Sequence, residues 1–333
     1  MNNSIIVSGG LGFIGSHMVI HLCNSGYSVV IVDTEIENKD TIIKNINKCI
    51  PDPSLYSIYS INILDIHDLS TVFKENNVSA CFHFAALKSV SESIEQPYLY
   101  YHNNITGLLN ILECCATNNC THFIYSSSAT VYGNQPSPLY EYNEIGKNIT
   151  NPYGQTKYMG EQIIQDFSKV YTNTQYYILR YFNPIGAHPS GNHGELYKAN
   201  STNIMPVLHK CILENKTFTI YGNNYNTKDG TPIRDYIHIM DLVDAHLLCI
   251  ENKKMNTGIH IYNIGSGSGY TVLELIKSLE EVSNKQILYA YNDRRPGDID
   301  IVYANTDKIN KELGWSPKYT LKDMCTHFLQ YIY

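Results

Sequence analysis

The sequence lacks the features that mark nucleic-acid binding or insertion into a membrane. It carries 24 basic and 31 acidic side chains, a formal net charge of -7, and no block of basic residues. An acidic chain repels polyanions, so nucleic acid is not an expected partner. No apolar stretch approaches about 18 residues, and no basic leader precedes the first apolar run. We therefore expect a cytoplasmic protein that does not enter a membrane.

Paired cysteines and metal-ligand clusters are also missing. The nine cysteines form an odd count without a CxxC pair, in a chain too long to need disulfide cross-links, so we interpret them as reduced thiols. His17 and His21 have the spacing of two metal ligands on one helix face. No glutamate lies between them and no third ligand is evident, so we expect no metal site.

The sequence does contain a regular alternation of short β-branched runs and helix-length segments. This pattern predicts an α/β fold of the Rossmann type, a doubly wound parallel sheet covered by helices on both faces. A length of 333 residues favours one large domain plus a smaller one. The predicted strands of the large domain cover residues 5–7, 29–32, 56–61, 80–84, 122–126 and 176–181.

The sequence pattern changes after Pro184. A loop rich in Gly, Pro, Ser and Asn covers residues 188–194. We therefore predict a Rossmann domain at 1–183. A smaller α/β substrate domain follows at 184–333, with some of its segments returning to the first domain.

A glycine turn with the sequence SGGLGFIG, residues 8–15, follows the first predicted strand. Its glycines allow the backbone to approach a pyrophosphate, and the next helix presents free N–H groups and the positive end of its dipole. A simple tight turn is the ordinary alternative. Asp33 ends the second predicted strand, where a carboxylate can bind the adenosine ribose hydroxyls. Glu35 and Glu37 follow it and would repel a 2′-phosphate, so NAD is favoured over NADP. We therefore predict that the Rossmann domain at 1–183 binds NAD.

Tyr153 and Lys157 lie four residues apart at the start of a predicted helix, which places them on one face. Deprotonating a phenol near pH 7 needs roughly 4 kcal/mol, since its ordinary pKa is about 10. An ammonium about 6 Å away supplies about 3 kcal/mol at an effective dielectric near 20. The positive nicotinamide ring can add the remainder. We therefore expect Tyr153 to act as a general base and acid, although such a pair is also common on a helix surface.

Six blocks along the chain resemble the UDP-glucose 4-epimerases of the extended short-chain dehydrogenase/reductase family. They cover residues 8–17, 83–88, 126–133, 153–157, 180–191 and 234–238. The resemblance implies reversible conversion of UDP-glucose to UDP-galactose, in galactose metabolism, by an NAD-dependent isomerase. It also implies a homodimer built on helices at 98–118 and 153–171.

The resemblance assigns roles by position. Tyr153 would take the 4-hydroxyl proton, Lys157 would hold the nicotinamide ribose, and Ser128 would relay the proton. The implied cofactor-binding residues are Gly9, Gly12, Phe13, Ile14, Gly15, Asp33, Asn62, Ile63, Phe84, Ala85, Ala86, Lys88, Asn103, Ser126, Tyr153, Lys157 and Tyr181. The implied substrate-binding residues are Lys88, Ser128, Thr130, Tyr153, Phe182, Asn183, Asn203, Tyr221, Arg234, Arg295, Asp298 and Val302.

The chain departs from the family pattern at three places. Asn62 replaces an Asp that receives the adenine amino group, and residues 34–36 replace an Asn-rich turn. Val302 falls where members select sugar size with a bulky or a small residue. Valine leaves room, so we expect conversion of UDP-GlcNAc and UDP-GalNAc as well. Tyr303 is adjacent, and a shift of one residue in the alignment would reverse this prediction.

Other functions stay open. A 4,6-dehydratase or decarboxylase of the same family would need an acid after the serine strand, where Ala129 and Thr130 stand. A UDP-glucuronate 4-epimerase also lacks that acid and needs only a cation for the carboxylate. A non-catalytic NAD-binding regulator would have lost Ser128, Tyr153 or Lys157, and all three are present.

Overall fold

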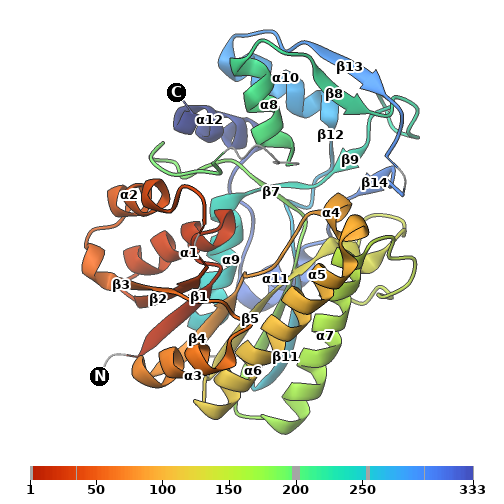
Figure 1. The fold of residues 1–333 in the computed structure, drawn as a ribbon. Coiled ribbons are helices and arrows are strands. Elements are labelled where there is room, and N and C mark those ends of the chain that lie inside the picture. Colours follow the sequence, from red (N-terminus) through yellow and green to blue (C-terminus); the bar gives the residue numbers. More distant parts are fainter. Residues whose placement is uncertain (1–2, 35, 197–202, 253–255, 296, 333) are drawn as a thin grey trace. The chain divides into compact units, whose positions relative to one another are not determined.

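The computed structural model describes residues 3–34, 36–196, 203–252, 256–295 and 297–332. The chain divides into two compact units, each formed by several segments (Figure 1). Unit 1 contains residues 1–133, 144–181 and 243–262. Unit 2 contains residues 134–143, 182–242 and 263–333.

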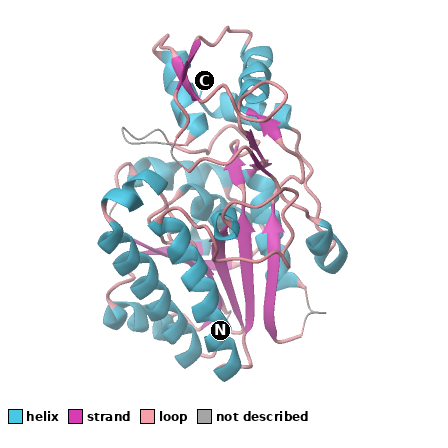
Figure 2. Cartoon of the chain, turned by 90° about the vertical axis from the view of Figure 1, so that its right-hand side faces the viewer, coloured by secondary structure: helices cyan, strands magenta, loops and turns pink. Residues whose placement is uncertain are grey.

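Unit 1 is built on a seven-stranded sheet with the order β11-β6-β5-β4-β1-β2-β3. Every adjacent pair from β6 to β3 is parallel, and Figure 2 shows strands of this sheet side by side. The order β3-β2-β1-β4-β5-β6 is that of a dinucleotide-binding sheet, whose ligand crevice opens beyond the strand ends where the order reverses, between β1 and β4. The strands are β1 (Ser4–Ser8), β2 (Ser28–Asp33), β3 (Tyr56–Ser60), β4 (Val78–His83), β5 (His122–Ser128), β6 (Gln175–Tyr181) and β11 (Gly258–Ile264).

Helices cover both faces of this sheet because the strands bury alternate side chains on each side. Ile6, Val30 and Phe123 point to one face and pack with Leu69, Ile111 and other residues of α3, α6 and α7. On the other side α1 packs against α2, and His21 of α1 contacts Asp244 of α9 at 3.0 Å. The main helices are α1 (Phe13–Asn24), α2 (Lys39–Cys49), α3 (Ile66–Glu75), α4 (Val90–Glu95), α5 (Pro97–Tyr101), α6 (Gly107–Thr117), α7 (Pro152–Val170) and α9 (Ile239–Glu251).

Unit 2 is a smaller α/β unit, whose described residues form three short sheets. Their strand orders are β10-β7, β12-β9-β14 and β13-β8. Its core packs Leu208, Leu275, Leu279 and Phe328 against the strands. The strands are β7 (Asn183–Ile185), β8 (Phe218–Tyr221), β9 (Ile233–Arg234), β10 (Tyr236–His238), β12 (Tyr270–Thr271), β13 (Tyr289–Asn292) and β14 (Ile301–Val302). The helices are α8 (Ile204–Leu213), α10 (Val272–Ser283), α11 (Asp307–Leu313) and α12 (Leu321–Ile332).

The predicted fold class is confirmed, and each predicted strand of the large domain is present. The helix expected at 98–118 is interrupted: α5 runs into a π-helical turn, η2 (His102–Thr106), before α6 begins. The boundary predicted at residue 183 stays a prediction, and the compact units divide between Tyr181 and Phe182. All nine cysteines are free thiols. Among the described helices, none combines the length and apolar character needed to cross a membrane.

Candidate functional site

The glycine turn after β1 is shaped for close approach by a ligand. Gly9 has φ +72°, and a Cβ there would lie 2.6 Å from the Ala85 amide nitrogen. A Cβ on Gly15 would lie 2.1 Å from the Gly9 carbonyl oxygen. Gly12 is the N-cap of α1, no side chain caps this helix, and its first turn holds no acid. The turn therefore fits an anionic pyrophosphate at a helix N-terminus.

Asp33 is positioned by the same turn. The Leu11 amide donates to Asp33 Oδ2 at 2.9 Å, and the Thr34 amide donates to Oδ1 at 2.9 Å. An ionised carboxylate has about four acceptor positions, so Asp33 suits a diol such as a ribose. Glu37 is exposed nearby, and Glu35 lies outside the described residues.

Asn62 and Ile63 follow β3 in a turn. The Leu64 amide donates to Asn62 Oδ1 at 3.0 Å, which leaves that oxygen one lone pair for a ligand. Ile63 is buried, and its side chain packs on Gly107 of α6. Asn62 therefore stabilises its own turn through this hydrogen bond. The sequence predicted only a contact between Asn62 and the adenine of the cofactor.

The segment after β4 is clamped to two helices. Asn104 Oδ1 accepts from the Leu87 amide at 2.9 Å, and its amide group donates to the Leu87 carbonyl at 3.0 Å and to Thr156 Oγ1 at 3.1 Å. Asn103 donates to Asn104 Oδ1 at 3.0 Å. Both asparagines lie in the π-helical turn η2, a distortion that often marks functional positions. Phe84, Ala85 and Ala86 thus lie at the β4 end opposite the glycine turn, while Lys88 is exposed.

Ser126, Ser128, Tyr153 and Lys157 come together at the end of β5 and the first turns of α7. Asn151 caps α7 by accepting from the Gly154 amide at 2.8 Å, with Pro152 in the first turn. Lys157 Nζ donates to the Ser126 carbonyl at 2.6 Å and lies 3.3 Å from Ser126 Oγ. It also lies 5.9 Å from the centre of the Tyr153 ring. The cap fixes where α7 begins, and it thereby positions Tyr153 and Lys157 next to the end of β5.

Burial has the largest effect on the pKa values of Tyr153 and Lys157. Burial raises the pKa of the Tyr153 phenol, against a hydrogen bond from Ser128 that lowers it. Burial also lowers the pKa of Lys157 to about 7. Desolvation therefore disfavours the charged form of each protein group, and the stabilisation of the Tyr153 phenolate by Lys157 together with a nicotinamide ring stays a prediction. Next to them, burial and then the Lys157 charge lower the pKa of His83 to about 3, and Ser8 Oγ lies 2.7 Å from its ring.

Three further predicted residues have their polar groups engaged or enclosed. The Tyr181 hydroxyl lies 2.5 Å from His246 Nε2, and Tyr181 is buried at the end of β6. Thr130 Oγ1 is inaccessible and has no hydrogen-bond partner among the described residues. In unit 2, Phe182 is buried and its amide donates to the Ile264 carbonyl at 3.1 Å.

In unit 2, three of the predicted nucleotide-binding residues, Arg234, Arg295 and Asp298, form a charged cluster, in which the Asp298 amide donates to the Arg295 carbonyl at 3.1 Å. Arg234 of β9 forms an ion pair with Asp298. The Arg295 guanidinium lies 4.1 Å from the centre of the Tyr221 ring. Asn183 Nδ2 donates to the Asp235 carbonyl at 3.1 Å, next to Arg234 in the chain. Asn203 donates to Glu195 at 2.6 Å and belongs to a different contact.

Val302 lies on the same face as Arg234. The two residues are partners in the parallel pair of β14 and β9, so their side chains project to one side. Tyr303 projects to the other side, where its ring and Ile233 approach Gly269. The strand register therefore favours Val302 over Tyr303 as the neighbour of the charged cluster.

Comparison with known proteins places this geometry in a family. The GDP-mannose 4,6 dehydratase family matches residues 6–328. UDP-glucose 4-epimerase of Bacillus subtilis (strain 168) is 43% identical over 324 residues, covering 97% of this chain and 94% of that protein. The chain belongs to this family and to that of the UDP-glucose 4-epimerases.

Solved structures of UDP-glucose 4-epimerases share the whole fold. The crystal structure from Bifidobacterium longum in complex with NAD+ and UDP is 39% identical with a TM-score of 0.91, and covers 99% of this chain and 98% of that one. The UDP-Glc/GlcNAc 4-epimerase from Campylobacter jejuni is 30% identical with a TM-score of 0.83, and covers 99% of both chains. The predicted family and the predicted enzyme class, an NAD-dependent epimerase, are confirmed.

The site also contains a buried charged group that no sequence motif predicted. Beside Ser127, Arg180 of β6 and Glu161 of α7 form a buried ion pair at 2.7 Å. Ser127 Oγ donates to Glu161 at 2.5 Å. Two signals were present: Arg180 is the one charge in an apolar strand, and Glu161 follows Lys157 by one helical turn. The pair ties the serine strand to α7.

Proposed function

We propose that this protein interconverts UDP-glucose and UDP-galactose by transient oxidation at C4 of the sugar. The observation that supports it most is the grouping of Ser128, Tyr153 and Lys157 at the strand ends of a sheet whose glycine turn fits a dinucleotide. NAD is the cofactor that fits, because Asp33 suits a ribose diol and repels a 2′-phosphate. When bound, NAD takes the C4 hydrogen with its electron pair and later returns it.

The protein groups then have defined tasks. Tyr153 accepts the 4-hydroxyl proton as the C–H bond breaks and returns it when the C4 carbonyl is reduced. Ser128, hydrogen-bonded to Tyr153, passes that proton between the sugar oxygen and the phenol. Lys157 is held by Ser126 at 2.6 Å and stabilises the phenolate. Inversion requires the 4-keto sugar to turn over before reduction, which suits firm anchoring of the UDP portion and loose contacts to the sugar.

Arg234, Arg295 and Asp298 provide that anchoring in unit 2. Two guanidinium groups match a diphosphate, and Asp298 can accept from hydroxyls. We assign Tyr221 and Asn183 to the same nucleotide. The UDP that the Bifidobacterium longum enzyme holds supports this substrate class.

Val302 extends the substrate range to UDP-GlcNAc and UDP-GalNAc. Its register beside Arg234 places a small side chain on the face of the charged cluster, which leaves room for an acetamido group. The name of the Campylobacter jejuni relative, a UDP-Glc/GlcNAc 4-epimerase, supports this range. Val302→Tyr should remove conversion of UDP-GalNAc and keep that of UDP-galactose; equal loss of both would contradict this specificity.

The test of the function is product analysis with purified protein, separately with UDP-galactose, UDP-GalNAc and UDP-glucuronate and without added NAD. We expect conversion of the first two and release of nicotinamide dinucleotide on denaturation. Tyr153→Phe should lower kcat by about 10²–10⁴-fold with the dinucleotide retained. Tyr56→Phe is the matched control, because its hydroxyl donates to Asn47 at 2.7 Å, away from the serine strand and the start of α7. Full turnover by Tyr153→Phe would disprove the catalytic assignment, and conversion of UDP-glucuronate alone would shift the substrate class.

We also propose a cytoplasmic homodimer. Ile94, Tyr98, Leu99, Leu109 and Met159 are exposed apolar side chains on α4 to α7 of unit 1, where a helical dimer interface would bury them. The free thiols agree with a reducing compartment. Sedimentation analysis should give twice the chain mass; a monomer at micromolar concentration would contradict the assembly.

A further inference from the structure

Asp298 is shared between two partners in unit 2. One oxygen, Oδ1, forms the ion pair with Nη2 of Arg234. The other, Oδ2, accepts a hydrogen bond from the Tyr225 hydroxyl at 2.9 Å. Arg234 Nη1 is engaged with the Ile233 carbonyl at 2.8 Å. Tyr225 therefore contacts the carboxylate that neutralises Arg234, although Tyr225 is not itself among the predicted substrate-binding residues.

Tyr225 is held on its ring faces as well as at its hydroxyl. Its side chain is 4% exposed, and the Arg294 guanidinium lies 3.7 Å from the ring centre. Such a cation over an aromatic face is a favourable contact. Burial and then the charge of Asp298 raise the pKa of the phenol, so the hydroxyl stays a donor at neutral pH.

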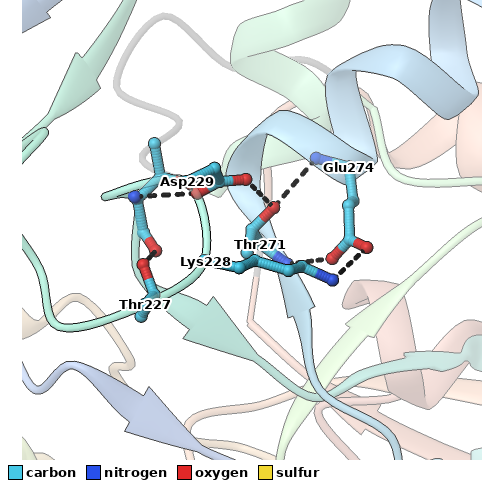
Figure 3. A network of polar contacts seen from close by, with 6 residues as sticks. Thr227, Lys228, Asp229, Thr271 and Glu274 are labelled. Atoms are coloured by element: carbon cyan, nitrogen blue, oxygen red, sulfur yellow. Dashed lines mark hydrogen bonds and ion pairs between the residues drawn. The ribbon is translucent and has the colours of Figure 1, made fainter.

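The loop that carries Tyr225 is fastened to the N-terminus of α10. Asp229 accepts from the Thr231 amide at 2.9 Å, from Thr231 Oγ1 at 2.7 Å and from Thr271 Oγ1 at 2.5 Å. Lys228 forms an ion pair with Glu274, which also completes the capping box with Thr271 (Figure 3). These contacts join the loop to a helix end rather than leaving it in solvent.

The same scaffold carries Arg234. Thr271 belongs to β12, and its neighbour Tyr270 pairs with Arg234 of β9. On the other side, the Asn226 amide donates to Asp300 Oδ2 at 3.0 Å, and Asp300 forms an ion pair with Arg294. The tyrosine, the aspartate and the arginine are therefore placed by one connected set of contacts.

The two oxygens of the Asp298 carboxylate have different partners, and this affects how Arg234 can bind an anion. A carboxylate with both oxygens free can pair with a guanidinium through two parallel hydrogen bonds, which is the strong geometry for both groups. That pairing would compete with a diphosphate for the same N–H groups. Among the described residues, Oδ2 of Asp298 accepts from the Tyr225 hydroxyl and Oδ1 accepts from Arg234, so the hydroxyl orients the carboxylate for a single contact with that guanidinium.

We propose that Tyr225 is a positioning residue for nucleoside diphosphate binding, because its hydroxyl holds one Asp298 oxygen and keeps Arg234 available to the diphosphate. This inference rests on the proposed function. The role is indirect, since Tyr225 acts through Asp298 and not on the reacting sugar.

The direct test is Tyr225→Phe, which removes the hydroxyl and keeps the ring beneath Arg294. Calorimetric titration with UDP should show the Kd raised about tenfold, the scale of one hydrogen bond to a charged group. The KM for UDP-galactose should rise similarly with kcat unchanged, because UDP anchoring is common to ground and transition states. Tyr27→Phe is the matched control, since its hydroxyl donates to a carboxylate, Glu251, at 3.4 Å in unit 1. It should bind UDP as the parent does.

A double-mutant cycle with Asp298→Asn separates positioning from simple packing. An amide carries no charge to compete for Arg234, so adding Tyr225→Phe in that background should change the Kd by less than about twofold. Independent, additive effects would overturn the inference. So would a Tyr225→Phe protein of lowered thermal stability and unchanged UDP affinity.

Failure of this inference can be told from failure of the proposed function. If the parent protein binds UDP and Tyr225→Phe binds it equally, only the role of Tyr225 is overturned. If the parent protein binds no UDP, the proposed function is overturned together with it.

Discussion

Replacing Arg180 by methionine should lower the free energy of unfolding by about 3–5 kcal/mol, the usual cost of leaving one buried charge without its partner. Arg180 Nε and Nη2 donate to the two oxygens of Glu161 at 3.0 and 2.7 Å, a bidentate pair. The two side chains are 2% and 0% exposed. Burial alone would lower the pKa of Arg180, and the bonds and charge of Glu161 raise it instead.

The magnitude depends on what is left behind. Without Arg180, the Glu161 carboxylate keeps the Ser127 hydroxyl at 2.5 Å as its hydrogen-bond donor, and Tyr132 loses the Arg180 contact at 2.9 Å. Removing both charges, with Arg180→Met and Glu161→Leu together, should recover most of the loss, because buried pairs are often replaced by apolar residues at little cost.

Urea unfolding followed by far-UV circular dichroism, at a fixed NAD concentration, measures both variants. Lys169→Met is the control, since that lysine forms an exposed pair with Asp166 and such pairs contribute little. A loss below about 1 kcal/mol for the single variant would refute the reasoning, as would a double variant no more stable than the single one.

Three further outcomes follow from the same structure. Gly15→Ala should abolish co-purification of NAD, since its Cβ would lie 2.1 Å from the Gly9 oxygen; dinucleotide released on denaturation measures this, and normal content would contradict the role of the turn. The parent protein should gain stability from pH 7 to pH 10, because the pKa of Lys157 is about 7 when folded and near 10.5 when unfolded; melting curves of Lys157→Met should lack this rise. Burial raises the pKa of Asp229, but the hydrogen bonds from Thr271 and Thr231 together lower it below its ordinary value. The ionised Asp229 therefore stabilises the fold above about pH 4, and this contribution is lost on acidification. Asp229→Asn should flatten that acid limb in thermal unfolding, and an unchanged limb would count against the loop contact.

Much of unit 1 is predictable from the sequence because its signals are local. The run at residues 29–32 is a buried β2, and the spacing of Tyr153 and Lys157 does place both in the first turns of one helix. The glycine turn could be read because a positive φ and a clash at a Cβ are properties of single positions. The helix predicted at 98–118 was less accurate, since the π-helical turn at His102–Thr106 depends on the clamp that Asn104 forms with a distant loop.

The sequence by itself determined the family, the α/β fold class and the residue types that can transfer a proton beside a dinucleotide, because these depend on periodicity and on short motifs. Only the tertiary structure decided that desolvation governs the pKa values of Tyr153 and Lys157, that Arg180 meets Glu161, and that Val302 shares a face with Arg234. Burial, strand register and contacts between distant segments are properties of the packed chain, and no local pattern of residues encodes them.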